Sequence, residues 1–277
     1  MQSRVVRSIS GRVLSAGLAL GASGCGLIGP GAPPAPARAE ARPVKPPPPP
    51  APRKPPVRPM ASDSSGRVVL RAANQTRGSK IMVSLKDRWL WYVVGRDTAL
   101  SVPVAVGKNE NFEYNGRKFR FETPVGRRKV LKKEPSPIWT VPEWHYMEKA
   151  AERGLELVRL QANARVKLSD GSFLVVRGQD VGRINQFGNF WPFTPGTEIV
   201  FDNKIFMPPN GTRQRRVPDA LGPYKLDTGD GYLIHGTHLY NAESVGQAVS
   251  HGCVRMDNDD LVQLYRMVSA GTPVFIF

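Results

Sequence analysis

Residues 234–256 read IHGTHLYNAESVGQAVSHGCVRM and contain two segments of interest, IHGTH (234–238) and SHGCVRM (250–256). The chain has four histidines, and three of them fall in this stretch beside Cys253. A thiol at neutral pH is only a few per cent thiolate, and the thiolate is the species that attacks a carbonyl. A nearby imidazole can take the thiol proton and later give it to a leaving amine. The stretch therefore predicts a cysteine nucleophile, Cys253, with His235 as its base 18 residues earlier.

The residues next to Cys253 suit acyl transfer. Gly252 allows the backbone to approach a carbonyl closely, and the N–H groups of Gly252 and Cys253 can hold a tetrahedral oxyanion. Arg255 can pair with a substrate carboxylate in forked geometry. Zinc bound by Cys253 and the three histidines is the competing interpretation. The spacing contains neither C-x-x-C nor H-E-x-x-H, so it favours the nucleophile over a metal site.

The first 24 residues are typical of a signal peptide. A short apolar run, residues 13–22, follows three arginines and ends in small residues before Cys25. This arrangement predicts a bacterial lipoprotein, in which Cys25 is acylated. An ordinary signal peptide cut within residues 25–39 is the alternative. Either way Cys253 has no cysteine partner, which is unusual for an exported protein and indicates a function for its thiol. We expect location in the periplasm or cell envelope, with a lipid anchor in the membrane.

The composition divides the chain after the signal peptide. Fourteen of the 26 prolines lie between residues 30 and 59, so we expect residues 26–66 to form a disordered, extended linker. The formal net charge is +16, or +13 without the first 24 residues, and such a surface attracts polyanions or anionic membranes. The export signal argues against nucleic acid as the partner. No stretch after residue 30 approaches the ~20 apolar residues that span a bilayer.

Residues 67–277 have the sequence pattern of a mainly β domain. Short apolar, β-branched or aromatic runs alternate with turn residues, which favours a sandwich or barrel-like fold over a βαβ sheet. Asp202-Asn203 predicts a two-residue hairpin turn. Helices are expected only at residues 143–155 and after a cap at Asp257 or Asn258, the latter ending at Gly271. The segment at about 143–217 is interpreted as an insertion, either a lid or a subdomain. The strands are expected at 81–85, 89–94, 100–106, 172–176, 199–201, 204–206, 232–234 and 274–277.

The pattern HGT…SHGCVRM resembles the signature of L,D-transpeptidases with a YkuD-type catalytic domain. Five further segments agree with that family in order. They are VPVAVGK (102–108), TPVGRRKV (123–130), IWTVP (138–142), ALGPYKL (220–226) and GTPVFIF (271–277). The resemblance covers roughly residues 79–142 and 218–277, and the middle of the chain departs from it.

This resemblance implies a mostly β catalytic domain that acts on peptidoglycan and needs no metal or organic cofactor. The cysteine attacks the bond before the terminal D-Ala of a tetrapeptide stem. The acyl-enzyme then passes to an amine, which forms a 3→3 cross-link or attaches a protein to the wall. The residues implied as catalytic are Cys253, His235, His251 and Gly252. Those implied on the substrate side are Arg255, Ser250, Thr237 and Gly236. The resemblance assigns no role to His238, which we expect to be an exposed loop residue.

Two other functions remain open at this stage. The same residues could serve an L,D-carboxypeptidase or endopeptidase, in which water rather than an amine removes the acyl group. A non-catalytic wall-binding module is the second alternative, and it predicts that Cys253→Ala leaves the function intact.

Overall fold

A computed structural model describes residues 64–277, which belong to one compact unit, Pro50–Phe277. The expected signal peptide (residues 1–24), the lipid-bearing Cys25 and the linker before residue 64 lie outside the described residues. Within residues 64–277, no helix combines the length and apolar character that crossing a bilayer requires.

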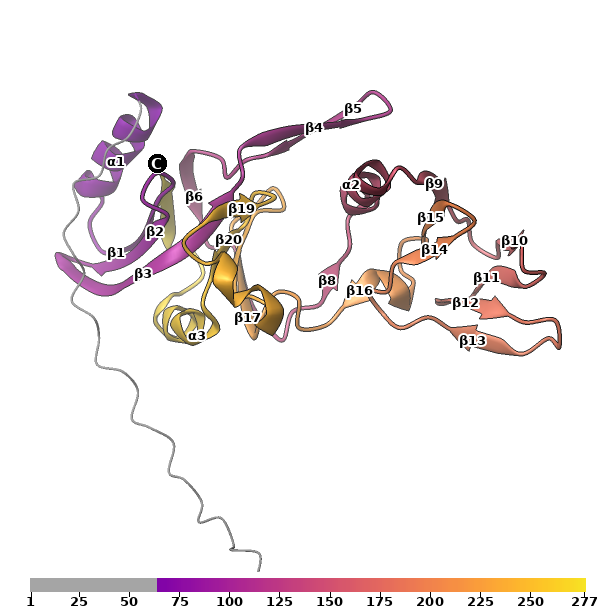
Figure 1. Cartoon of the computed structure of the whole chain (residues 1–277). Helices are drawn as coiled ribbons and strands as arrows, with labels where there is room; N and C mark the ends of the chain where they lie inside the picture. The colour runs from indigo at the N-terminus through magenta and orange to yellow at the C-terminus, as the bar shows by residue number, and fades with distance from the viewer. Residues whose placement is uncertain (1–63) are drawn as a thin grey trace, which may run out of the picture. The chain divides into compact units, whose positions relative to one another are not determined.

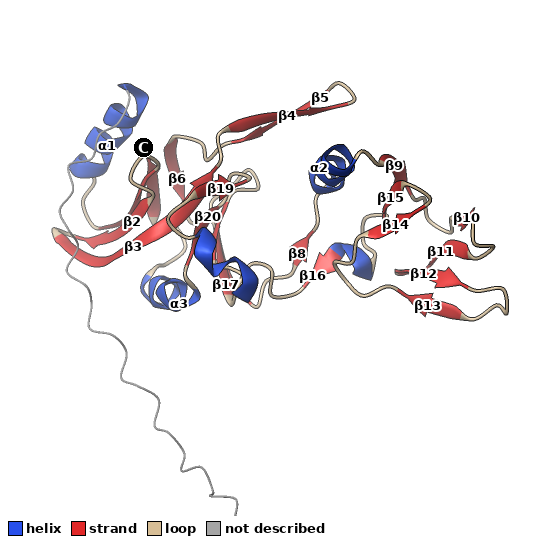
Figure 2. Ribbon diagram, in the orientation of Figure 1, coloured by secondary structure: helices blue, strands red, loops and turns tan. Residues whose placement is uncertain are grey.

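Ten strands form the main sheet, which carries both motif segments (Figure 1). The order along the sheet is β6-β21-β1-β2-β3-β20-β18-β17-β7, and β19 pairs with β3 off this path. The strands are β1 (Ser79–Ser84), β2 (Trp89–Val94), β3 (Asp97–Gly107), β6 (Gly126–Lys129), β7 (Lys132–Pro135), β17 (Tyr224–Asp227), β18 (Leu233–His235), β19 (Ala248–Ser250), β20 (Val254–Met256) and β21 (Pro273–Ile276). The prediction of a mainly β fold with few helices is confirmed (Figure 2).

The first strands pair because apolar residues alternate along them. Ile81 and Val83 of β1 are fully buried and lie opposite Tyr92 and Leu90 of β2. Alternate residues of a strand point to the same face of the sheet, so these four side chains share one buried face. The last strand, β21, joins β1 in parallel with Val274 opposite Ile81, which brings the two ends of the domain together.

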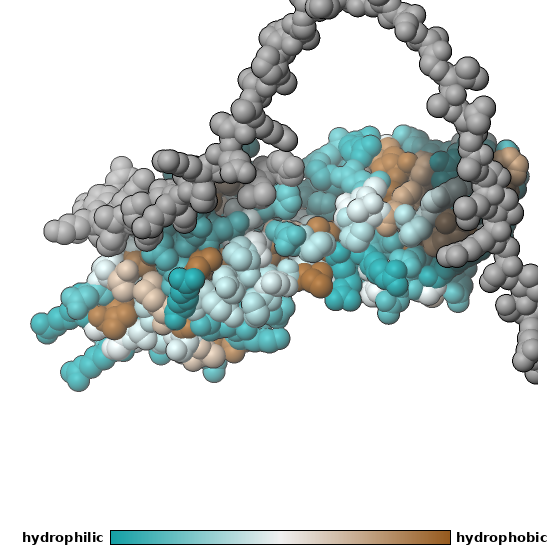
Figure 3. Space-filling view, turned by 90° about the horizontal axis from the view of Figure 1, so that it is seen from below, coloured by the Kyte–Doolittle hydropathy of each residue, from teal (hydrophilic) through white to brown (hydrophobic). Residues whose placement is uncertain are grey.

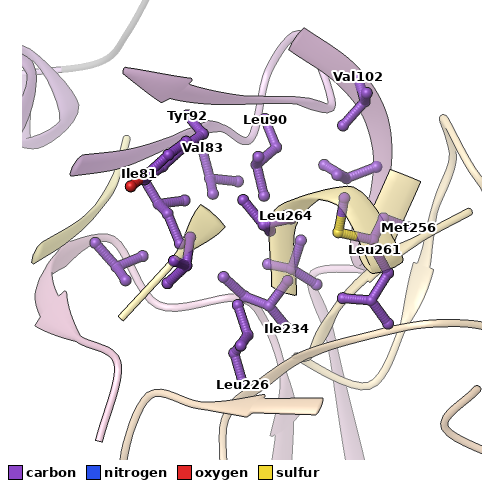
Figure 4. Close-up of a cluster of buried hydrophobic side chains, with 14 of the residues drawn as sticks. Ile81, Val83, Leu90, Tyr92, Val102, Leu226, Ile234, Met256, Leu261 and Leu264 are labelled. Atoms are coloured by element: carbon purple, nitrogen blue, oxygen red, sulfur yellow. The ribbon is translucent and has the colours of Figure 1, made fainter. Parts of the chain in front are cut away.

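Helix α3 (Asn258–Met267) lies within the curl of the sheet (Figure 4). The side chain of Asp257 accepts a hydrogen bond from the N–H of Asp259 at 2.8 Å, as expected of an N-cap. Leu261 and Leu264 are fully buried. Their core cluster includes side chains from both halves of the sheet, among them Ile81, Val83, Leu90, Leu226 and Ile234. The sheet and this one helix therefore share a single core.

The helix ends at Met267, four residues before the expected stop at Gly271. Val268 is already extended, and the chain turns so that the N–H of Gly271 reaches the carbonyl of Val130 at 2.7 Å. Lys133 completes this end of the helix, because its Nζ donates to the carbonyls of Tyr265 and Val268 at 2.5 and 2.6 Å. A cation at a helix C-terminus is favourable for the helix dipole.

Helix α1 (Ser64–Gln75) corrects the domain boundary, since we expected the linker to extend to residue 66. Ala73 is fully buried in a cluster with Phe275 of β21. The buried Lys80 donates from Nζ to the carbonyls of Ala73 and Thr76 at 2.7 and 2.8 Å. Because these contacts are made with strands β1 and β21 rather than within the helix, the sequence of the helix alone does not predict them.

Residues 143–217, expected as an insertion, form elements outside the main sheet. Helix α2 (Glu143–Arg153) confirms the helix predicted at 143–155. One buried cluster gathers Leu174, Val181 and Phe206, and a second contains Ile205 and residues of α2. The strands are β9 (Glu156–Arg159), β10 (Arg165–Lys167), β11 (Phe173–Arg177), β12 (Asp180–Ile184), β13 (Phe190–Pro192), β14 (Ile199–Phe201) and β15 (Lys204–Met207). The first cluster lies wholly within the insertion, whereas the second also contains Val141, Trp139 and Tyr114 from outside it.

The hairpin predicted at Asp202-Asn203 is confirmed. Strands β14 and β15 pair antiparallel around it, with Phe201 opposite Lys204. The two turn residues have φ values of 50° and 57°, which is the left-handed conformation that a type I′ turn needs.

Two further strand pairs and two 3-10 helices complete the described chain. Strands β8 (Trp139–Thr140) and β16 (Arg216–Val217) pair antiparallel at the two ends of the insertion, and β4 (Glu110–Tyr114) pairs with β5 (Arg117–Phe121). The 3-10 helices are η1 (Arg213–Arg215) and η2 (Leu239–Ser244). On the face seen in Figure 3, apolar residues form small separate patches among hydrophilic ones.

Candidate active site

The two motif segments meet as neighbouring strands of the main sheet. Strands β18 and β20 pair in parallel, with Ile234 opposite Val254 and His235 opposite Arg255. Ile234 and Val254 are buried in the core. Residues that alternate with them point to the other face of the sheet. His235 and Arg255 therefore share that face, and Cys253 directly precedes β20.

Cys253 lies at the entry to β20 and is partly exposed. Its Sγ is 4.0 Å from the carbonyl oxygen of Gly231. Burial is the main influence on the thiol and raises its pKa, against a hydrogen bond with the backbone of Leu233 and the charge of Arg255. The resting sulfur is therefore a protonated thiol at neutral pH, and it needs a base before it can attack.

His235 has the protonation state that a base requires. Its side chain is buried, and Nδ1 lies 2.6 Å from the carbonyl oxygen of Gly236. A carbonyl only accepts, so Nδ1 carries the proton and the neutral ring leaves Nε2 as a proton acceptor. Burial, and then the charge of Arg255, lower the pKa of His235 to about 3. The imidazole is therefore neutral over the whole range in which a thiol could lose its proton.

The turn from Ser250 to Cys253 is held by hydrogen bonds from within. Ser250 Oγ donates to the carbonyl of Cys253 at 2.6 Å and accepts from the N–H of Gly252 at 3.1 Å. The carbonyl of Ser250 accepts from the N–H of Lys108 at 2.9 Å. We expected the N–H of Gly252 in an oxyanion hole, and in this geometry it is already engaged by Ser250.

Gly252 is required at its position. Its φ is +131°, and a Cβ there would lie 2.9 Å from a ring carbon of Tyr232 and 3.0 Å from the carbonyl oxygen of Glu122. Its own carbonyl accepts from Thr123 Oγ1 at 2.8 Å, and the same hydroxyl oxygen accepts from the N–H of Gly107. Thr123 therefore ties the turn to the end of β3.

A side-chain amide holds the backbone after His235. Asn258 Oδ1 accepts from the N–H of Thr237 at 2.9 Å, and Asn258 Nδ2 donates to its carbonyl at 3.0 Å. A Cβ on Gly236 would lie 2.1 Å from that Oδ1, so this glycine makes room for the amide. Thr237 and Gly236 thus position His235 through Asn258, which the sequence had suggested only as a helix cap. His238 is half-buried in the loop that follows.

Arg255 adds an uncompensated positive charge to this face. It is half-buried, and none of the ion pairs formed within residues 64–277 involves it. Its charge acts on both His235 and Cys253. A guanidinium without a carboxylate partner beside a partly exposed thiol is suited to binding an anionic group.

Comparison with known proteins decides the family. Residues 78–276 match the family model YkuD, the L,D-transpeptidase catalytic domain, which is most of the chain. The chain belongs to this family. The matched residues include both motif segments and the insertion between β8 and β16.

Curated relatives of this YkuD-family chain match over shorter segments. A Bacillus subtilis (strain 168) protein named L,D-transpeptidase YkuD is 45% identical over 65 residues, which is 23% of this chain and 38% of the relative. Its namesake in Bacillus licheniformis is 51% identical over 84 residues, or 30% and 44%. The L,D-transpeptidase YbiS of Escherichia coli (strain K12) is 48% identical over 59 residues, or 21% and 18%. The chain therefore matches less than half the length of each of these relatives.

Solved structures of L,D-transpeptidases are also similar to this YkuD-family chain. One from Xylanimonas cellulosilytica has a TM-score of 0.39 at 15% identity and covers 76% of this chain and 68% of its own. The NMR structure of the Enterococcus faecium catalytic domain has a TM-score of 0.35 at 18% identity, with coverages of 73% and 99%.

The YkuD-family site contains one group that the motif does not reveal. Glu148 of α2, in the insertion, lies with one carboxylate oxygen 2.8 Å from Nε2 of His251. Lys108 Nζ is 2.9 Å from the other oxygen. The ring of Trp144, also on α2, stacks on His251 with centroids 4.3 Å apart. The only sequence signal for Glu148 and Trp144 was their place on a predicted helix.

Proposed function

We propose that the chain is an L,D-transpeptidase that acts on peptidoglycan stem peptides through an acyl-enzyme at Cys253. The observation that supports this most strongly is one face of the main sheet. It carries a buried neutral imidazole, His235, and an unpaired guanidinium, Arg255, next to a partly exposed thiol, in a chain of the YkuD family.

The first half of the reaction is acylation. His235 Nε2 takes the proton of the Cys253 thiol as the sulfur attacks the carbonyl carbon of the donor peptide bond. The tetrahedral intermediate collapses with loss of the amine, which receives the proton from His235. The product is a thioester between Cys253 and the shortened stem. The N–H of Cys253 is our candidate for stabilising the oxyanion, since that of Gly252 is bound to Ser250.

The second half returns the enzyme to its starting state. An acceptor amine attacks the thioester carbonyl and loses a proton to His235 Nε2. The carbon–sulfur bond breaks, a new peptide bond forms, and the proton passes back to the sulfur. Arg255 holds a carboxylate of the stem in forked geometry during both halves. The product is a 3→3 cross-link or a protein attached to the wall.

The test uses the full chain and purified tetrapeptide muropeptides, with products read by mass spectrometry. Cross-linked dimers that disappear with Cys253→Ala support transpeptidation. Tripeptides without dimers would instead indicate an L,D-carboxypeptidase. Wall binding that is unchanged in Cys253→Ala, with no product from either protein, would indicate a binding module.

A carbapenem provides an independent probe of the nucleophile. Opening of its strained lactam by a thiolate leaves the whole molecule on the sulfur, so the mass of the protein rises by that of the drug. We expect the adduct on Cys253 in the wild type and none in Cys253→Ala. An unmodified wild-type thiol after prolonged incubation would overturn the role of Cys253.

We propose further that the chain is exported and held to a membrane by lipid on Cys25. The support is the sequence of residues 1–25 alone. Cell fractionation with and without Cys25→Ala tests it. We expect the wild type with the membranes and the variant in the soluble envelope fraction. Identical fractionation of the two would overturn the anchor.

A further inference from the structure

The carboxylate of Glu148 is buried and ionised. Its residue is 8% exposed, yet it lies within hydrogen-bond distance of both His251 and Lys108. Burial works against ionisation, but the hydrogen bonds and charges of Lys108 and His251 outweigh it and lower the pKa of Glu148. A buried carboxylate without such partners would be strongly destabilising. The burial of the Glu148 carboxylate therefore depends on its contacts with His251 and Lys108.

The bond to Glu148 fixes the state of the His251 ring. An ionised carboxylate only accepts hydrogen bonds, so Nε2 of His251 must carry the proton. The ring is also held by two aromatic side chains. Trp144 stacks on it at 4.3 Å, and Phe121 of β5 meets it edge-on with centroids 4.5 Å apart. Its tautomer and its orientation are both determined by residues that lie far away in the sequence.

His251 belongs to the turn that presents the nucleophile. The backbone on either side of it is held by Lys108, directly after β3, and by Thr123, between β5 and β6. Its side chain is held by Glu148 and Trp144 of α2. The insertion therefore holds the turn that carries Cys253 through one hydrogen bond and one stacked ring.

We propose that Glu148 is a positioning residue, which acts through His251 to hold the Cys253 turn and so makes α2 of the insertion part of the active site. This inference rests on the proposed function for its effect on rate. The contact itself can be tested without any activity.

The charges around His251 give the contact a spectroscopic signature. Glu148 of α2, Lys108 after β3 and Arg255 of β20 all act on the ring. His251 in turn acts on the neighbouring His145, and Lys108 is also paired with Glu110. Burial lowers the pKa of His251, Lys108 and Arg255 lower it further, and Glu148 opposes them. Loss of the Glu148 charge should therefore lower this pKa, whereas loss of the Lys108 charge should raise it.

The first experiment measures the second-order rate of Cys253 acylation by a carbapenem in the full chain. Glu148→Ala should reduce this rate roughly 10- to 100-fold, because a small misplacement of a reacting group costs this much. Glu148→Gln should restore it to within about threefold, since its amide oxygen still accepts from Nε2. Glu152→Gln is the control, because Glu152 sits on the same helix in an exposed pair with Lys149. A wild-type rate in Glu148→Ala would overturn the proposal.

The second experiment is an NMR titration of His251 with ¹⁵N-labelled imidazole in the full chain. We expect the proton on Nε2 in the wild type, a lower pKa in Glu148→Gln, a higher one in Lys108→Met and no change in Glu152→Gln. An unchanged His251 in Glu148→Gln would overturn the contact, even if Glu148→Ala fails to fold. If the wild type forms no carbapenem adduct and no muropeptide product, the proposed function is wrong. The titration would still show whether Glu148 contacts His251.

Discussion

The two His-Gly steps of the site, His235-Gly236 and His251-Gly252, have the same sequence but contrasting environments. His235 is held by its own chain, through the carbonyl of the next residue. His251 is held across a separation of 103 residues, through the carboxylate of Glu148. The first ring loses its proton because it is buried beside a cation, whereas an anion partly offsets burial at the second. The same dipeptide thus gives a buried neutral ring at one place and a ring bound to a carboxylate at the other, because the neighbouring groups differ.

The largest effect that distinguishes the two rings is on the rate. His235→Gln removes the proton acceptor, so the rate of Cys253 acylation should fall by about 10³-fold. His251→Asn removes only an anchor, and we expect a loss of about tenfold. The measurement is mass-resolved acylation by a carbapenem, with circular dichroism as the control for folding. Equal losses in the two variants would mean that the rings share one role.

A methyl group on Gly252, the glycine of the second His-Gly step, should lower the free energy of unfolding by more than the backbone strain of its φ alone. Gly252→Ala combines a φ of +131° with close approach to Tyr232 and Glu122, and we expect a loss of about 3 kcal/mol of unfolding free energy.

Gly246→Ala is the matched control for this glycine. Its φ is +86°, but a Cβ there meets nothing within 4 Å, so only the backbone strain of about 1 kcal/mol remains. Urea unfolding measures both. If the two variants lose the same free energy, the turn at Gly252 is not tightly enclosed.

The burial of His235 should appear in the pH dependence of stability. Its pKa is about 3 in the folded chain and about 6.5 in the unfolded chain, so the unfolded state binds the proton first. Stability is therefore complete above pH 6.5 and is lost as the pH falls from there toward 3. The contribution between pH 7.5 and 5 is about 2 kcal/mol. His235→Gln should lack this part of the loss in urea titrations, and identical pH profiles would contradict the burial of a neutral ring.

The smallest effect concerns the local support of His235. Asn258→Ala removes both hydrogen bonds to the backbone of Thr237, and we expect a loss of about 1–2 kcal/mol. Asn258→Asp keeps the acceptor for the N–H and loses the donor, so its urea midpoint should fall between those of the wild type and the alanine variant. A urea midpoint for Asn258→Ala equal to that of the wild type would show that Asn258 does not stabilise the backbone after His235.

The sequence was most informative where the contacts are local. The Asp202-Asn203 turn, the cap at Asp257 and the strand runs are set by neighbouring residues, and they appear as predicted. The pair of His235 and Cys253 was suggested by what a thiol nucleophile needs. The bond from the N–H of Gly252 to Ser250 depends on turn geometry, which the letters do not specify.

The features that the sequence did not reveal depend on distant contacts. Helix α1 contains Val68 and Val69 and follows a proline-rich segment, so its own residues favour a helix only weakly. Packing against β21 and the cation of Lys80 stabilise it instead. Glu148 was one charged residue among several on α2, and only the folded chain brings it to His251.

The short pair of β8 and β16 has a consequence for how such a protein can change. Trp139 lies opposite Val217, so the chain leaves for the insertion and returns from it at the same place. The main sheet is complete without residues 143–217, because β7, before the pair of β8 and β16, bonds directly to β17, after that pair. A different cassette could be spliced between these two points without rebuilding the nucleophile's strands. Because Glu148 and Trp144 of that segment hold His251, a replacement that changes selectivity would have to supply a carboxylate and a ring at the same place.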